Sequence, residues 1–298
     1  MRKMRILIIL FFVATTALFV VYNIKNLAVE DSQAPVISCD SDTIQVSIES
    51  TEEDLLSGMS AQDNRDGDVT DSMVVVSKSK FVEKGKCRVN YAAFDKNSNV
   101  ATYTRYLEYT DYTSPHFSIT EPLRFDTSKD VENLSQYIHA EDCLDGDISG
   151  LIKMRYVDDG YVYGQSGDVG INCQVTNTSG DTVQMTVNLE MLDAEEYNKT
   201  HPILTEYLVY TRVNESVDPS QYLIGVETGM SQYLFEEHEG QIGDEEQEPE
   251  YERDDIRIES NVDYNTPGIY TIRYTATSFD GYNKEIMGST TLYVIVEE

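Results

Sequence analysis

The sequence contains no tryptophan and only four cysteines. Basic residues are few: the chain has 22 lysines and arginines but 53 aspartates and glutamates. The formal net charge is −31 at pH 7, and such a chain repels a phosphate backbone, so we expect no nucleic-acid partner. Hydrophobic residues still make up 40% of the chain, and its 21 tyrosines favour strands over helices. We therefore expect a folded protein with the acids on its surface.

Motifs that carry catalysis are also missing. The sequence has no Gly-x-Ser-x-Gly, no phosphate-binding glycine loop and no His-Glu-x-x-His. His139 lies four residues before Cys143, but their surroundings are acidic, whereas a reactive thiolate needs an electropositive setting. Carboxylates are too numerous for any one pair to indicate a glycosidase site. We assign no catalytic residue and expect a protein that is not an enzyme.

The first 29 residues differ in composition from the rest. Three basic residues within the first five positions precede an uncharged run, Ile6–Ile24, which as a helix rising ~1.5 Å per residue spans close to the ~30 Å core of a bilayer. Residues 1–29 contain no acid, and the leading basic residues place the N-terminus in the cytoplasm and the acidic remainder outside. We interpret 1–29 as a cytoplasmic tip and a transmembrane signal anchor in the cell membrane. The alternative is a cleaved signal peptide, with Thr15-x-Ala17 as the candidate cleavage motif; both export the remaining chain.

Internal repeats follow this segment. Proline-containing segments recur at residues 34–38, 114–118 and 201–205, at spacings of 80 and 87 residues. Residues 61–70 (AQDNRDGDVT) match residues 140–149 (AEDCLDGDIS) without a gap, 79 positions further along the chain. Such repetition indicates successive copies of one structural unit.

Alternating apolar residues predict the strands of that unit. Residues 85–95 and 268–276 each begin with a glycine and then place an apolar side chain at every second position, which puts Tyr91 and Tyr274 in the core. Residues 169–175 alternate in the same way in the middle copy. Alternation of this length is typical of half-buried strands in a sandwich. The predicted fold class is all-β, with three tandem Ig-like β-sandwich domains after one N-terminal transmembrane helix.

The repeats also set the expected domain boundaries. We place domain 1 at residues 30–112, domain 2 at residues 113–194 and domain 3 at residues 195–298. Domain 3 carries an acidic insertion at residues 236–255, which we expect to be a solvated loop kept open by charge repulsion.

The repeated sequence motif resembles that of a known protein family. The run Ala-x-Asp-x-x-Asp-Gly-Asp, followed by an alternating Gly-x-Tyr-x-Val-x-Tyr-x-Ala-x-Asp strand, resembles the bacterial surface-protein Ig-like repeat, a relative of hyalin-type repeats that is also appended to pesticidal crystal proteins. The resemblance covers residues 34–110 and 115–192, and residues 202–297 only in their second half. It implies non-enzymatic extracellular domains used for adhesion, for carbohydrate or protein contact, or as spacers. Domain 3 lacks the Asp-Gly-Asp turn, so the resemblance gives no role for that turn there.

Acidic turns are the candidate metal site. In an Ig-type sandwich several loops meet at one pole, and carboxylates gathered there supply the six to eight oxygens that Ca²⁺ takes. The alternative is that Asp-Gly-Asp only makes a tight turn, in which aspartate side chains accept hydrogen bonds from local N–H groups. The spacing differs from that of an EF-hand, and we expect no other cofactor. The candidate ligands are Asp63, Asp66, Asp68 and Asp95 with Asp31 in domain 1, and Asp111, Asp142, Asp145 and Asp147 with Asn177 and Asp181 for domain 2.

Cysteines are divided evenly between the first two domains. In an exported chain this favours the disulfides Cys39–Cys87 and Cys143–Cys173, each stabilising by roughly 4 kcal/mol in the chain-entropy model. The alternative is that the thiols stay reduced as small buried apolar side chains. Zinc is not expected, because the sequence has no Cys-x-x-Cys and its histidines are scattered.

These features together predict a membrane-anchored extracellular protein that acts as a cell-surface binding or adhesion module for a glycan or protein ligand. The alternative is a passive stalk, or an accessory subunit of a membrane machine that assembles envelope polysaccharide. An exposed apolar or tyrosine-rich patch on one domain would favour binding over a stalk.

Overall fold

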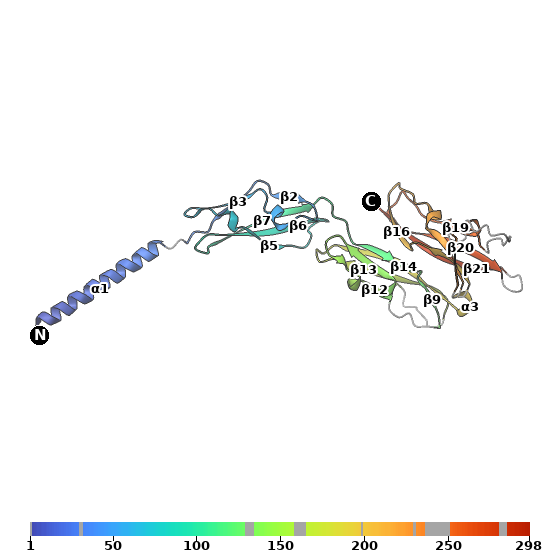
Figure 1. The fold of residues 1–298 in the computed structure, drawn as a ribbon, viewed down its shortest axis with the longest axis horizontal. Helices are drawn as coiled ribbons and strands as arrows, with labels where there is room; N and C mark the ends of the chain where they lie inside the picture. The colour runs from blue at the N-terminus through green and yellow to red at the C-terminus, as the bar shows by residue number, and fades with distance from the viewer. Residues whose placement is uncertain are drawn as a thin grey trace, which may run out of the picture. The chain divides into compact units, whose positions relative to one another are not determined.

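A computed structural model of the chain describes residues 2–29, 32–128, 134–157, 165–197, 199–228, 231–235, 251–279 and 285–298. One long helix, α1 (Arg2–Val29), is followed by strands and single helical turns (Figure 1). The short helices are α2 (Glu52–Leu55), α3 (Ala194–Tyr197), η1 (Thr70–Ser72), η2 (Leu134–Gln136), η3 (Ser149–Leu151), η4 (Pro219–Tyr222) and η5 (Arg253–Asp255).

Helix α1 is apolar along its length. Its segment Lys3–Ile24 is 22 residues long, sufficient in length and composition to cross a bilayer, and its apolar side chains face solvent. A helix that is hydrophobic all round needs an apolar environment, which the described residues of the chain do not supply.

Six sheets form three sandwiches with the same topology. In each domain the first strand pairs with the third and the third with the fourth, while the second, seventh, sixth and fifth strands form the other sheet in that order. The prediction of an all-β chain with three sandwiches after an N-terminal helix is confirmed. Domain 1 contains β1 (Val36–Cys39), β2 (Thr43–Val46), β3 (Met59–Asp63), β4 (Gly67–Asp68), β5 (Val74–Lys78), β6 (Lys86–Phe94) and β7 (Val100–Tyr109). Domain 2 contains β8 (His116–Ile119), β9 (Arg124–Asp126), β10 (Ile138–Asp142), β11 (Gly146–Asp147), β12 (Lys153–Tyr156), β13 (Gly167–Thr176) and β14 (Thr182–Leu192). Domain 3 contains β15 (Thr200–Leu204), β16 (Leu208–Arg212), β17 (Leu223–Thr228), β18 (Ser231–Leu234), β19 (Arg257–Ser260), β20 (Gly268–Phe279) and β21 (Glu285–Glu297).

Parallel pairing recurs at one position of every sandwich. The second strand of each domain runs parallel to the last, in the pairs β2 with β7, β9 with β14 and β16 with β21. All other strand pairs within the described sheets are antiparallel. The first part of each domain is thereby tied to its final strand.

Alternation along the sixth strand builds each core. In β6, Cys87, Val89, Tyr91 and Ala93 point inward and are buried, and the Tyr91 hydroxyl donates to the Leu55 carbonyl at 2.9 Å. In β20 the buried Tyr274 donates to the Pro219 carbonyl at 2.8 Å. The predicted core positions of both tyrosines are confirmed.

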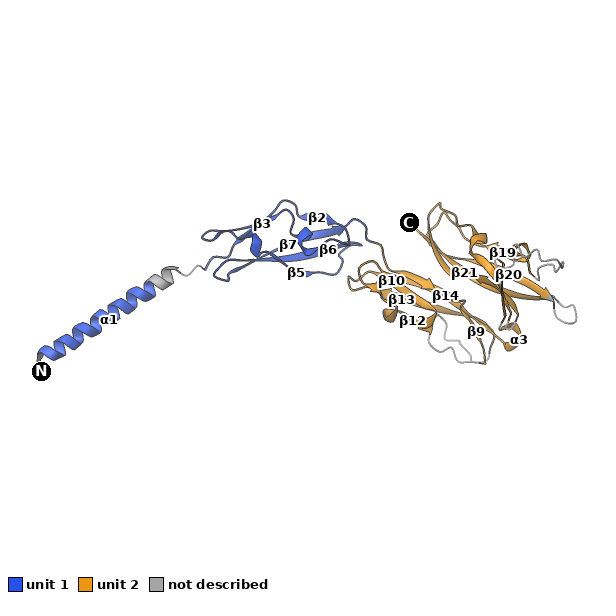
Figure 2. Cartoon of the chain, in the orientation of Figure 1, with its two compact units in different colours: residues 1–112 blue, residues 113–298 orange. Residues whose placement is uncertain are grey.

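The chain folds as two compact units, residues 1–112 and residues 113–298 (Figure 2). The first contains helix α1 and domain 1, and the second contains domains 2 and 3, whose buried side chains form one continuous cluster. The Tyr210 hydroxyl of domain 3 accepts a hydrogen bond from the Phe117 N–H of domain 2 at 2.8 Å, and Tyr293 exchanges hydrogen bonds with the Asn188 backbone. Domains 2 and 3 therefore share a packed interface.

Candidate functional site

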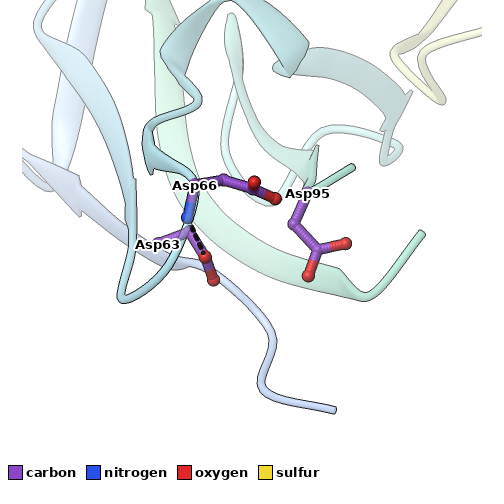
Figure 3. A group of neighbouring side chains, drawn as sticks. All are labelled: Asp63, Asp66 and Asp95. Atoms are coloured by element: carbon purple, nitrogen blue, oxygen red, sulfur yellow. Dashed lines mark hydrogen bonds between the residues drawn. The ribbon is translucent and has the colours of Figure 1, made fainter. Parts of the chain in front are cut away.

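Three carboxylates meet at one pole of domain 1. Asp63 ends strand β3, Asp66 lies in the turn before β4, and Asp95 follows strand β6. Antiparallel pairing of β3 with β4 folds the turn back, and one oxygen of each carboxylate lies within 4.8 Å of the others (Figure 3). Residues 32 positions apart in the sequence are thus brought together, as the shared pole of an Ig-type sandwich predicts.

Asp63 organises the turn. Its Oδ1 accepts hydrogen bonds from the backbone N–H groups of Arg65 and Asp66, both at 2.8 Å, and Gly67 takes a φ of +78° that a residue with a Cβ rarely adopts. The N–H of Asp66, followed by that of Arg65, holds the pKa of Asp63 below its usual value. Asp63 is therefore a carboxylate at neutral pH.

Asp66 and Asp95 are tied to the loop after β6. The Lys96 N–H donates to Asp66 Oδ2 at 2.9 Å, and the Lys96 ammonium lies 3.5 Å from Asp66 Oδ1 on a side chain that is 79% exposed. Asp95 accepts from the backbone N–H and from the side-chain amide of Asn99, both at 2.7 Å. These bonds orient the two carboxylates and leave lone pairs on their oxygens free for another ligand.

One oxygen of this group lacks a partner. Asp63 is only 7% exposed, and within the described part of the chain its Oδ2 accepts no hydrogen bond. Burying an unpaired carboxylate oxygen is costly, and here other carboxylates add repulsion. Positive charge reaches the pole from Arg65, whose attraction helps to lower the pKa of Asp63, and from the exposed Lys96 beside Asp66, but no described group donates a hydrogen bond to Asp63 Oδ2.

Domain 2 repeats the same loops with one exchange. Asp142 Oδ1 accepts from the N–H groups of Leu144 and Asp145, as Asp63 does from its own turn. The loop after β13 closes between Asn177 and Asp181, as the loop after β6 closes between Asp95 and Asn99. The acid and the amide have changed places, so the Asn177 amide donates to Asp142 Oδ2 at 3.0 Å. The oxygen that is unpartnered in domain 1 is satisfied in domain 2.

The other predicted ligands lie apart from this group. Asp68 accepts from the Thr70 N–H and Asp147 from the Ser149 N–H, which are local turn contacts. Hydrogen bonds from the following Thr or Ser hydroxyl and N–H lower the pKa of both carboxyls. Asp111 accepts from Ser47 and the Ile48 N–H, contacts within domain 1 rather than with the domain 2 turn.

The remaining candidates lie in domain 2 or outside the described residues. Asp145 accepts from the Thr178 N–H at 2.6 Å, and Asp181 accepts from the Ser114 hydroxyl at 2.6 Å. Asp31 and residues 236–250 of the acidic insertion lie outside the described residues.

The predicted disulfides Cys39–Cys87 and Cys143–Cys173 are wrong for this structure, in which all four cysteines are free thiols. Cys87 and Cys173 point into the domain cores from the sixth strands, and burial raises the pKa of the Cys173 thiol to about 11. Their intended partners are engaged elsewhere, because the Cys39 thiol donates to the Ser41 carbonyl at 2.9 Å and the Cys143 thiol to the Thr113 carbonyl at 3.1 Å.

Sequence reasoning identified the loop residues that distinguish the two poles in domain 2 but not all of those in domain 1. Asn177 and Asp181 stood out as loop residues near the domain 2 turn, but Asn99 did not. Aligning DKNSN at residues 95–99 with NTSGD at residues 177–181 shows the exchange of acid and amide directly. That alignment was the available signal, and it has meaning only once the two loops are known to face the Asp-Gly-Asp turns.

Comparison with known proteins gives no family for the chain. No family model and no curated protein matches the sequence. Similar solved structures include the CBM51-2 and INT domains of Clostridium perfringens ZmpB in complex with GlcNAc (18% identity over 51% of this chain and 26% of that one, TM-score 0.21). They also include the protocadherin gammaB7 EC3-6 cis-dimer (10% identity, 89% and 74% coverage, TM-score 0.21) and human CDH23 EC21-23 (13% identity, 88% and 100% coverage, TM-score 0.19). The chain spans about a quarter of the ZmpB structure, and similarities at this level identify no ligand.

Proposed function

We propose that this chain is a single-pass membrane protein with a cytoplasmic N-terminus, which displays its sandwich domains outside the cell as a non-catalytic binding or adhesion module for a glycan or protein ligand. The observation that carries the proposal is helix α1. Its segment Lys3–Ile24 is long enough to span a bilayer and exposes its apolar side chains, ahead of domains that contain every acid of the chain.

Orientation is supported by charge. Arg2, Lys3 and Arg5 precede the apolar segment, whereas the chain beyond residue 29 carries 53 acids. Basic residues are retained on the cytoplasmic side, so the domains are placed outside. An acidic surface there avoids anionic lipid headgroups and attracts divalent cations.

An exposed apolar face supports a binding role over that of a passive stalk. Val74 pairs with Ala92 in the β5–β6 ladder and Phe94 pairs with Val100 in the β6–β7 ladder, and the alternation of β6 places Ala92 and Phe94 on its outward side. Val74, Phe94 and Val100 are 46%, 39% and 47% exposed. Neighbouring exposed apolar side chains on a sheet face are a common feature of recognition surfaces.

Anchoring is tested by tagging both ends of the full chain and probing intact cells. We expect a membrane-impermeant antibody or protease to reach the C-terminal tag, and the N-terminal tag to become accessible only after permeabilisation. Both tags should remain with the membrane fraction after carbonate extraction. Loss of the N-terminal tag, with the C-terminal tag in the medium, would instead establish a cleaved signal peptide.

Binding is tested with the purified full chain in nanodiscs on glycan and protein arrays. We expect a ligand that Phe94→Ser weakens at least tenfold and that Met287→Ser, which alters an exposed apolar side chain of domain 3, leaves unchanged. Absence of any ligand, or capture of an envelope-polysaccharide enzyme equally by both variants, would favour the stalk or accessory-subunit alternative.

A further inference from the structure

We propose that domain 1 binds a calcium ion through Asp63, Asp66 and Asp95, and that domain 2, which carries the same Asp-Gly-Asp turn, does not. Calcium binding at this pole of domain 1 depends on the local carboxylates and is independent of any ligand that the protein recognises.

Three negatively charged groups lie close together at this pole, and two of them are buried. The three carboxylates each offer an oxygen within 4.8 Å of the others, and Asp63 and Asp95 are both 7% exposed. Asp63 Oδ2 accepts no hydrogen bond from any described residue, so a buried anionic oxygen lacks a direct partner. A bound cation supplies the missing partner and removes the mutual repulsion of the carboxylates.

The oxygen ligands and their spacing suit calcium. Oxygens that ligate one Ca²⁺ at about 2.3–2.6 Å lie at most about 5 Å apart, whereas oxygens on one Mg²⁺ at about 2.0–2.1 Å lie at most about 4.2 Å apart. The three oxygens lie within 4.8 Å of one another, inside the limit for calcium, and calcium accepts the irregular geometry that the strict octahedron of Mg²⁺ does not. Three carboxylates leave several coordination positions for water, so we expect the modest affinity of extracellular calcium modules, a Kd of about 0.1–1 mM.

Domain 2 is the internal control. Its turn places Asp142 and Asp145 as domain 1 places Asp63 and Asp66, but Asn177 stands where Asp95 does and donates its amide to Asp142 Oδ2 at 3.0 Å. That amide occupies the position where a cation would bind and removes one negative charge. The same backbone thus carries a metal site in one copy and an amide–carboxylate hydrogen bond in the other.

The experiment measures calcium stoichiometry on the full-length chain in detergent micelles by equilibrium dialysis with ⁴⁵Ca²⁺ at physiological salt. Five proteins are compared: the wild type, Asp95→Asn, the domain 2 exchange Asn177→Asp with Asp181→Asn, Asp71→Asn and Lys96→Gln. Asp71 is an exposed acid of domain 1, so its variant carries the same charge change as Asp95→Asn and corrects for diffuse binding to an acidic surface.

We expect the wild type and Asp71→Asn to bind equally, Asp95→Asn to lose one calcium, and the domain 2 exchange to gain one. Lys96→Gln removes the ammonium near Asp66 and should lower the Kd about threefold. Equal binding by the wild type and Asp95→Asn overturns the site, and failure of the domain 2 exchange to gain a calcium overturns the explanation by acid–amide exchange.

Thermal unfolding of the same proteins gives an independent readout that does not depend on counting ions. Ligand binding to the native state alone should raise the Tm of the domain 1 transition by roughly 5–10 °C in 5 mM Ca²⁺ relative to EDTA. Asp95→Asn, in which an amide can pair with Asp63 Oδ2, should fold with an unchanged far-ultraviolet circular dichroism spectrum and show no such shift. A wild-type Tm equal in calcium and in EDTA contradicts the proposal.

Discussion

Arg124 of domain 2 and Glu227 of domain 3 form an ion pair, with Arg124 Nη1 3.0 Å from Glu227 Oε1. The Arg124 side chain is 6% exposed and also donates to the Thr290 hydroxyl at 2.8 Å. A buried guanidinium shared between two sandwiches links the folding of one to that of the other. Residues 113–298 behave as one unit because such contacts replace solvent at the interface.

Removing Arg124 should weaken that unit. We expect Arg124→Met to destabilise residues 113–298 by about 3 kcal/mol, because Glu227 and the Thr290 hydroxyl lose a buried partner. Denaturant unfolding measures the change. Arg257→Met is the control, since Arg257 pairs with Glu259 at the surface with both side chains more than half exposed, and should cost less than 1 kcal/mol. Equal effects of the two variants would contradict an interface role for Arg124.

Thiol chemistry should separate the cysteines into two classes. Cys39 and Cys143 are partly exposed and should react with a thiol reagent in the native protein, whereas Cys87 and Cys173 should react only on unfolding. Burial raises the pKa of Cys173 to about 11, so about one thiolate in a thousand molecules is present at pH 8. We also expect the Tm to be unchanged by dithiothreitol. Fewer than four thiols titrated after unfolding without reductant would indicate a disulfide.

Glu190 should give the second unit a pH dependence. Burial raises its pKa, against the attraction of Arg124, so the folded state holds the proton more tightly than the unfolded chain does. Its contribution to stability is complete below the unfolded pKa and is lost as the pH rises through the folded pKa. We expect Glu190→Gln, which keeps an oxygen to accept from the Thr291 hydroxyl, to gain stability relative to the wild type between pH 4 and pH 7. Urea unfolding at each pH measures this, and the exposed Glu215→Gln should show no such trend.

Gly288 marks a close approach of two strands in domain 3. A Cβ at this position of β21 would lie 2.1 Å from the Thr200 carbonyl oxygen of β15, so the backbone would have to move. We expect Gly288→Ala to destabilise the protein by about 3 kcal/mol. Gly150→Ala is the matched control, because its Cβ would meet no described atom within 4 Å, and it should change stability by less than 1 kcal/mol. Chemical denaturation of both variants distinguishes them.

Sequence patterns predicted the elements of the fold but not their partners. Alternation places Tyr91 and Tyr274 correctly, because period two is a property of each strand alone. It does not reveal which surfaces meet, so Arg124, Tyr210 and Tyr293 gave no sign of an interface. The disulfide prediction failed for the same reason. A disulfide requires two cysteine Cβ atoms at the correct distance and orientation, and an even number of cysteines in each domain does not reveal that geometry.

The acidic pole of domain 1 was also predicted only in part. Repeat matching brought the turns of Asp63 and Asp142 into register, and the fold class placed Asp95 beside the first of them. Whether a carboxylate or an amide faces the buried oxygen is a single-residue difference that leaves the strand pattern unchanged. Composition and periodicity are insensitive to such a difference. The structure shows that it decides whether the buried carboxylate oxygen has a hydrogen-bond donor.

The parallel ladders have a mechanical consequence for a chain held at its N-terminus. Tension between the two ends of such a chain enters each domain at its first strand and leaves at its last, and once it reaches the second strand it draws the second and last strands in opposite directions, so the backbone hydrogen bonds between them are sheared together instead of opening one at a time. The ladder has four registered pairs in domain 1, three in domain 2 and five in domain 3. Under pulling, domain 2 has the shortest of the three ladders to resist shear.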